Sequence, residues 1–137
     1  MKLSLKVEYA CQVLAQLGNF YGQKQLPHID DLAKAEKIPS NYLVQILNEL
    51  RNAGLIVSKR GKQGGYSLSR EAKLISLYEI VCAVDGALLD FNTEGQGASA
   101  SKTVGVWSAV AQHLEEKTKS YSVEDLMEVS SEKMWYI

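Results

Sequence analysis

The 137-residue sequence contains only two cysteines and two histidines. Two cysteines are too few for the disulfide framework of a small secreted domain. The two histidines, His28 and His113, lie far apart in the chain and cannot supply the ligand number of a zinc site. The sequence also lacks a paired nucleophile and base and a phosphate-binding loop. These absences argue against an enzyme, and we expect neither a cofactor nor a metal ion.

Long apolar runs are also missing, although 46% of the residues are hydrophobic. No stretch approaches the ~20 residues of a membrane-spanning helix. Near the N-terminus, Lys6, Glu8 and Gln12 interrupt any apolar core of a signal peptide. We therefore expect a cytoplasmic globular protein with no membrane partner and with reduced thiols.

The charge of the chain is low overall but unevenly distributed, with a net value of -1. Residues 1–73 carry eleven Lys and Arg against six Asp and Glu, whereas residues 74–137 carry four against ten. Basic side chains near phosphates release counterions, which favours binding to a polyanion. We therefore expect a nucleic acid to contact the first part of the chain.

The stretch from Ser40 to Leu68 contains the strongest structural pattern. Its first part has apolar residues at positions i, i+3, i+4 and i+7, the spacing of one face of a helix. Ser40 is a suitable N-cap, and Gly54 is a typical left-handed residue after the last turn. The predicted core-facing residues of this helix are Leu43, Ile46, Leu47 and Leu50.

A β-hairpin is predicted directly after this helix. Residues 55–58 are apolar and partly β-branched, which is typical of a strand. Residues 61–65 contain three glycines and indicate a turn, after which residues 66–68 can return as a second strand. A helix followed by a basic, glycine-tipped hairpin is the pattern of the recognition helix and wing of a winged helix-turn-helix.

The predicted DNA contacts lie on the polar face of this helix and on the hairpin. Gln and Asn side chains can pair with adenine edges, Arg and Lys can bind phosphates, and Arg60 can reach a minor groove. Glycines let the backbone approach a nucleic acid closely. A merely solvated polar face is the alternative for an isolated helix, and the basic wing argues against it. The predicted residues are Ser40, Asn41, Tyr42, Gln45, Asn48, Arg51, Lys59, Arg60, Lys62, Gly64, Gly65 and Tyr66.

Two helices are predicted before this unit. The first is capped by Ser4 and ends at Gly18 or Gly22, and the second begins near His28 as the first helix of the helix-turn-helix. Their expected inward-facing residues are Val7, Ala10, Cys11, Leu14 and Leu17 in the first helix, and Ile29, Leu32 and Ala33 in the second, with Ile38 covering its end.

Helices are also predicted after the hairpin. Ser76 and Glu79 form a capping box for a helix that stops at Gly86. Residues 87–102 are rich in Gly, Ser and Ala and predict a flexible loop, and a long helix follows from about residue 103 to 119. Its apolar side is too extensive for one small domain to cover, which predicts a homodimer. The expected fold is mainly α with a small β-hairpin: a winged helix-turn-helix DNA-binding domain at residues 1–73 and a dimerisation region at residues 74–137.

Six segments form a characteristic set: MKLS at 1–4, YLVQ at 42–45, LRNAGLI at 50–56, SKRG at 58–61, GGYSL at 64–68 and LYEIVCAVDG at 77–86. Together they resemble the Rrf-type family of bacterial transcription regulators. The resemblance implies a dimeric repressor whose two recognition helices read a pseudo-palindromic DNA operator. Cluster-binding members of that family carry three cysteines in the loop that corresponds to residues 87–102. This chain has none there, so we expect no iron–sulfur cluster.

The chain ends in an apolar segment with a free carboxylate, which can enter a pocket that holds the carboxylate and the last side chain. The ending resembles that of the family's repressors of cysteine metabolism. This implies cysteine synthase as a partner, with O-acetylserine displacing the tail. Packing of the tail on its own dimer is the alternative. The residues concerned are Trp135, Tyr136 and Ile137.

Two alternative functions stay open. One is an iron–sulfur or thiol redox sensor with non-standard ligands, such as Glu8 and Cys82 from two subunits. The other is a winged helix that binds only protein through its acidic second half, and the basic wing argues against it.

Overall fold

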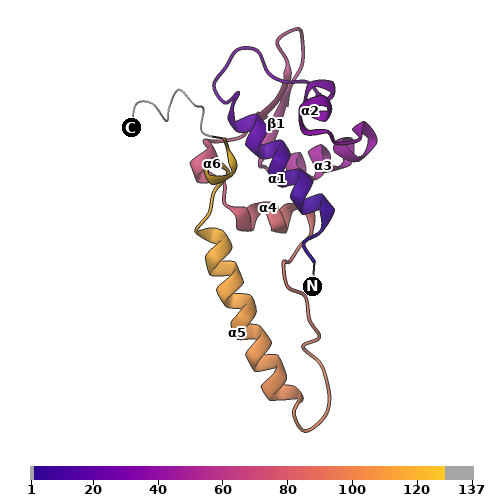
Figure 1. Cartoon of the computed structure of the whole chain (residues 1–137), viewed down its shortest axis with the longest axis vertical. Coiled ribbons are helices and arrows are strands. Elements are labelled where there is room, and N and C mark those ends of the chain that lie inside the picture. The colour runs from indigo at the N-terminus through magenta and orange to yellow at the C-terminus, as the bar shows by residue number, and fades with distance from the viewer. Residues whose placement is uncertain (1, 129–137) are drawn as a thin grey trace.

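The computed structural model describes residues 2–128 and confirms a mainly helical fold with one small hairpin and a long C-terminal helix (Figure 1). None of the helices in this range has both the length and the apolar character that a membrane span requires. The elements are α1 (Leu5–Gly18), α2 (Ile29–Glu36), α3 (Ser40–Asn52), β1 (Ile56–Lys59), β2 (Gly65–Leu68), the 3-10 turn η1 (Ala72–Leu74), α4 (Leu77–Val84), α5 (Ala100–Lys119) and α6 (Val123–Leu126).

One hydrophobic core connects all of these elements except α5. Residues from both sides of position 73 contribute to it, so the expected boundary at that position does not divide two separate cores. Its largest fully buried side chains are Val7, Leu14, Leu17, Leu32, Leu43, Ile46, Leu47, Leu50, Ile56, Leu68, Ile75 and Ile80.

Helix α1 begins at the predicted Ser4 cap, whose Oγ accepts a 3.2 Å hydrogen bond from the Val7 amide. It ends at Gly18, the first of the two predicted glycines. Cys11 is half-buried and packs against the core. Val13, which the predicted stripe did not include, is fully buried. Its burial follows from the contacts of α1 with α2, α3, α4, α6 and β2, which make the buried arc wider than one helical stripe.

Helix α2 and the turn after it lead directly into α3. The His28 amide donates a 2.9 Å hydrogen bond to the Asp31 carboxylate, which closes the N-terminus of α2. Lys37 ends the helix in the left-handed region at φ 56°. Ile38 is buried as predicted, and Pro39 prevents α2 from continuing.

The prediction that Ser40 caps α3 is wrong, because Pro39 occupies the cap and Ser40 is the first helical residue. The Pro39 backbone is not helical, with ψ 134°, and its carbonyl oxygen accepts hydrogen bonds from the amides of Tyr42 at 3.1 Å and Leu43 at 2.9 Å. A proline at this position already lacks the amide donor that a helix start leaves unpaired.

Helix α3 ends just before Gly54, the residue that was predicted to stop it. Gly54 adopts φ +79°, and its amide donates to the Arg51 carbonyl oxygen at 3.0 Å. The Leu55 amide donates to the Leu50 carbonyl oxygen, also at 3.0 Å. This pair of bonds is the Schellman motif, which satisfies the last carbonyl groups of the helix and directs the chain into β1.

The hairpin is antiparallel, with Ile56 opposite Leu68 and Lys59 opposite Gly65. The structure shifts β1 one residue later than predicted and starts β2 one residue earlier. The Ser69 amide donates to the Leu55 carbonyl oxygen at 3.0 Å, which extends the pairing to the end of α3.

The predicted capping box of Ser76 with Glu79 is present, and Ser122 and Asp125 form a second one at the start of α6. The two caps also lie side by side, because Ser76 and Ser122 form an antiparallel bridge. In this bridge the Leu77 amide donates to the Tyr121 carbonyl oxygen at 2.9 Å. The start of α4 is therefore hydrogen-bonded to the junction between α5 and α6.

Helix α5 begins at Ala100, three residues earlier than predicted, and shortens the expected loop accordingly. It packs against α4, and its N-terminal end extends away from the rest of the protein (Figure 1). Apolar side chains on this helix stay exposed in the protomer: Val106 is 64%, Trp107 40% and Val110 38% exposed.

Candidate nucleic-acid interface

The outward face of α3 is polar and accessible. Ser40, Asn41, Gln45, Asn48 and Arg51 are all exposed, whereas the four predicted core-facing residues of the helix are buried. The spacing of the apolar residues therefore fixes which side of α3 faces outward. Amide side chains on such a face can donate to and accept from base edges in a major groove.

Tyr42 has a structural contact in addition to its predicted role. Its ring is half-buried and meets the Tyr9 ring edge-on, with centroids 5.5 Å apart and planes at 80°. Aromatic pairs favour this geometry. Tyr42 therefore also fixes α3 to α1.

The only acidic residue of α3 is compensated by a base from α1. Lys6 Nζ lies 3.0 Å from Glu49 Oε1, which offsets a negative charge that would repel DNA phosphates. On the exposed side, Arg51 donates a 3.1 Å hydrogen bond to Asn48 Oδ1. This contact holds the Arg51 guanidinium along the outward face of the helix.

The hairpin presents its cations to solvent. Lys59, Arg60 and Lys62 are exposed, and none of them forms an ion pair with another residue between positions 2 and 128. Their charges are therefore free to meet an external anion.

The hairpin glycines have a different environment from the cations. Gly64 and Gly65 are buried and Tyr66 is half-buried. A Cβ atom on Gly64 would lie 2.2 Å from the Lys59 carbonyl oxygen, and one on Gly65 would lie 2.4 Å from the Pro27 carbonyl oxygen. The close backbone approach predicted from these glycines occurs within the protein, and a contact of Gly64 and Gly65 with DNA stays a prediction.

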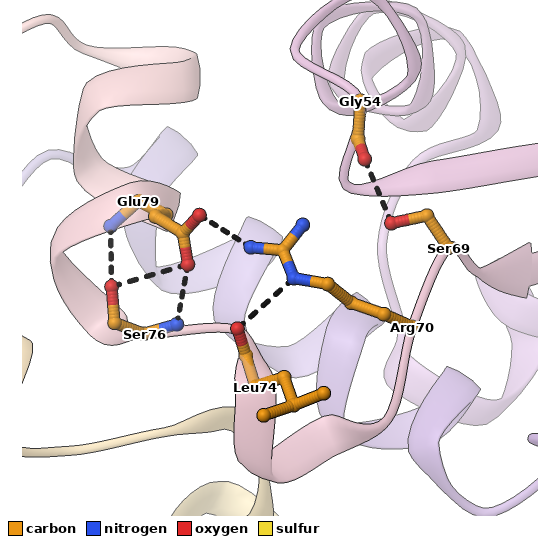
Figure 2. A network of polar contacts seen from close by, with 6 residues as sticks. All are labelled: Gly54, Ser69, Arg70, Leu74, Ser76 and Glu79. Atoms are coloured by element: carbon orange, nitrogen blue, oxygen red, sulfur yellow. Dashed lines mark hydrogen bonds and ion pairs between the residues drawn. The ribbon is translucent and has the colours of Figure 1, made fainter.

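Arg70 follows the hairpin, and its half-buried side chain is directed toward Glu79 and the Leu74 carbonyl group (Figure 2). Its Nε donates to the Leu74 carbonyl oxygen at 3.0 Å, and its Nη2 pairs with Glu79 Oε1. Glu79 Oε2 accepts a 2.9 Å bond from the Ser76 amide. Partial burial alone would raise the pKa of Glu79, but these bonds from Ser76 and Arg70 lower it. Glu79 is therefore a stable anion opposite Arg70.

The two cysteines of one chain do not form the thiolate set that usually holds an iron–sulfur cluster. Between residues 2 and 128, no three Cys, His, Asp or Glu side chains lie close enough together to hold a metal. Burial, and then the negative charge of Glu8, raise the pKa of Cys11 to about 11, so this thiol stays protonated at neutral pH. Cys82 is exposed on α4 and is not joined to Cys11 by a disulfide.

Known bacterial regulators share this fold and part of this sequence. The CymR structure, "the Global Cysteine Regulator of B. subtilis", superposes with a TM-score of 0.77 and 27% identity, covering 92% of this chain and 95% of that one. The T. potens IscR structure has a TM-score of 0.75 and 32% identity, covering 92% and 85%. A helix-turn-helix transcriptional regulator of Mycobacterium tuberculosis is 31% identical over 92% of this chain and 81% of its own length.

These relatives are described as transcription regulators and not as enzymes. The Rrf2 family model, described as an iron-dependent transcriptional regulator, matches residues 3–129. The chain therefore belongs to the Rrf2 family of DNA-binding transcriptional regulators.

Proposed function

We propose that this protein is a dimeric, sequence-specific repressor that works without an iron–sulfur cluster. The observation that carries the proposal is the continuous arrangement of an exposed polar α3 face and a hairpin with three exposed, unpaired cations among the described residues. A winged helix-turn-helix places the first in a major groove and the second along the adjacent backbone or minor groove.

The proposed roles follow the chemistry of each side chain. Gln45 and Asn48 contact base edges, and Tyr42 contacts a base or the backbone. Arg51 and Lys59 bind phosphates, which set the register of the protein on the duplex. Arg60 reaches the minor groove, where its charge is attracted by the concentrated negative potential. Val44, which is 46% exposed, can contact a thymine methyl group.

The proposed dimer uses α5. Its exposed apolar stripe, formed by Val106, Trp107 and Val110, is suited to burial against the same stripe of a second chain. A two-fold axis would place two copies of α3 in successive major grooves of a pseudo-palindromic operator.

The test of this function is footprinting of the full-length protein on the DNA upstream of its own gene. We expect a protected site with two related halves about one helical turn apart. Protection that is uniform along the DNA, or absent, would contradict a sequence-specific regulator.

We also propose that the regulated process is cysteine metabolism, with cysteine synthase as the partner. The similarity to CymR over 95% of that chain supports this proposal. The segment that would enter the enzyme, Trp135, Tyr136 and Ile137, lies outside the described residues. O-acetylserine would compete for the same pocket and displace the tail. Binding of the repressor to the enzyme would therefore depend on sulfur supply.

Calorimetric titration of cysteine synthase separates this proposal from packing of the tail on its own dimer. The full-length protein should bind the enzyme, and O-acetylserine should reduce that binding. A chain that ends at Tyr136 loses the Ile137 side chain and shifts the carboxylate, so it should bind far more weakly. No binding by the full-length chain, or equal binding by both, would exclude the tail contact.

A further inference from the structure

Two groups of hydrogen bonds, made by the neighbouring residues Ser69 and Arg70, link the end of α3 to the start of α4 (Figure 2). At one end, Ser69 Oγ donates a 2.7 Å bond to the carbonyl oxygen of Gly54, which follows the Ala53 C-cap of α3. At the other end, Glu79 and Ser76 close the N-terminus of α4. Arg70 contacts both η1, through the Leu74 carbonyl oxygen, and Glu79.

Further hydrogen bonds link the start of α4 to the end of α5. The Leu77 amide, directly after Ser76, donates to the Tyr121 carbonyl oxygen at 2.9 Å. The Val123 amide donates to the Ile75 carbonyl oxygen at the same distance. The residues on either side of the α5–α6 junction are thus bonded to the same short segment that Arg70 holds.

We propose that Arg70 is a positioning residue for DNA binding, which fixes the wing and the end of α3 relative to α4 and thereby to the dimer helix α5. This inference rests on the proposed function, because it concerns the spacing of two recognition helices in a dimer. A guanidinium suits the role because its planar donors can hold a carbonyl oxygen and a carboxylate at once in fixed directions. Holding α3 firmly relative to α5 sets the separation of the two DNA half-sites.

The proposal assigns Arg70 a role that differs from that of its basic neighbours. A cation near DNA ordinarily acts on phosphates, and loss of a nearby carboxylate then strengthens binding by removing repulsion. If Arg70 acts by holding Glu79, loss of the Glu79 charge must weaken DNA binding. The two roles therefore predict effects of opposite sign for the same substitution.

The decisive variant is Glu79→Gln. Glutamine at this position preserves the capping box with Ser76 but removes the charged partner of Arg70. With a duplex selected from a random library by the full-length wild-type protein, we expect Glu79→Gln to bind roughly tenfold more weakly. The matched control is Glu71→Gln, which removes an exposed carboxylate paired with Lys73 at 3.4 Å and should bind as tightly as wild type or slightly more tightly.

A second readout distinguishes positioning from a general loss of stability. One base pair inserted between the half-sites should weaken wild type strongly, because the two helices are held at a fixed separation. Glu79→Gln should discriminate less between the two duplexes, whereas partial unfolding would weaken both equally. Arg70→Lys keeps the positive charge but loses the planar donor geometry. If Glu79→Gln fails to fold, the affinity and the spacing discrimination of Arg70→Lys test the positioning role instead.

Each outcome has one meaning. Weaker binding with reduced spacing discrimination in Glu79→Gln, or in Arg70→Lys, supports the positioning role. Binding equal to or tighter than wild type by the folded variant, or unchanged spacing discrimination, overturns that role and leaves the proposed function intact. Failure of the wild-type protein to select any duplex overturns the proposed function together with this inference.

Discussion

The Tyr66 amide donates a 2.9 Å hydrogen bond to the Pro27 carbonyl oxygen, which joins β2 to the segment just before α2. The bond requires the two backbones to approach closely, and Gly65 makes this possible. At φ +142° a side chain is strained, and a Cβ atom would lie 2.4 Å from the same oxygen. The orientation of the wing against the helix-turn-helix therefore depends on a glycine.

Gly65→Ala should lower the free energy of unfolding by about 2–3 kcal/mol, because strain and a backbone clash combine. Gly61→Ala is the matched control: it has φ +101° but nothing within 4 Å of an added Cβ atom, so only the backbone strain of about 1 kcal/mol applies. Urea denaturation of the three proteins measures both values. If the two variants lose the same free energy of unfolding, the backbone at Pro27 moves away from the added Cβ atom without a measurable loss of stability.

Substitutions in the wing should affect DNA binding without affecting stability. Arg60→Ala should weaken binding to the selected duplex by about 1–3 kcal/mol if Arg60 contacts a groove, and Lys62→Ala should lower the salt slope by about one if it binds a phosphate. Both side chains are exposed, so melting temperatures should not change.

The control for the wing is Lys102→Ala. Lys102 is an exposed lysine near the start of α5, and Figure 1 shows that end of the helix farthest from the hairpin. Its removal should leave the affinity and the salt slope unaltered. If all three variants bind like wild type at moderate salt, the hairpin is not a wing that contacts DNA.

Local sequence signals were sufficient to predict most of the fold. The capping box at Ser76 and the stop at Gly54 depend on residues within a few positions of one another, and the structure contains both. The four-residue apolar stripe of α3 likewise defines its buried face. The N-cap of α3 differs, because a proline before a serine can itself supply the first carbonyl acceptor.

Contacts between distant segments could not be predicted in this way. The sequence places Arg70 among the basic residues around the wing, but its partner Glu79 is nine positions away and already explained by its capping role. Similarly, the glycine pattern predicts a close approach at Gly65 without indicating that Pro27 is the neighbour. Such pairings depend on how the elements pack and leave no periodic signal.

Protein purified without oxygen should be colourless, and an iron chelator should not change its affinity for DNA. The reason is the ligand set: cluster iron is held chiefly by thiolates, and the chain has only Cys11, which is half-buried, and Cys82 on another helix. Absorption spectra and iron analysis provide the measurement. A charge-transfer band with stoichiometric iron would contradict the prediction and direct attention to Glu8, Cys11 and Cys82.

Stability should fall at alkaline pH in a way that depends on Cys11. Burial and Glu8 raise its pKa from 9.0 to about 11, so between these values the unfolded chain loses a proton that the native chain retains. The unfolded state then binds fewer protons, and the free energy of unfolding decreases as pH rises, by up to about 3 kcal/mol. Below pH 9 this contribution is fully present.

Cys11→Ala isolates that contribution from the tyrosines and lysines that titrate in the same range. Urea denaturation at pH 8 and pH 11 should show a larger loss for wild type than for the variant. Parallel losses in the two proteins would mean that the Cys11 thiol is as easily ionised in the native state as in the unfolded state.

The last prediction concerns α5 as the dimer interface. Val110→Glu places a charge within the exposed apolar stripe, where a second copy of the helix would bury it without a partner. The dimer dissociation constant should rise by about two orders of magnitude or more, while helix content stays the same because Val110 is 38% exposed in the protomer. Gln112→Glu introduces the same side chain at an exposed polar position of α5 and should leave the dimer intact.

Analytical ultracentrifugation measures the dimer dissociation constants of both variants. DNA affinity should fall only for Val110→Glu, since a monomer can occupy one half-site at a time. If Val110→Glu stays dimeric at the same concentrations as wild type, the two chains associate through another surface and α5 does not set the separation of the recognition helices.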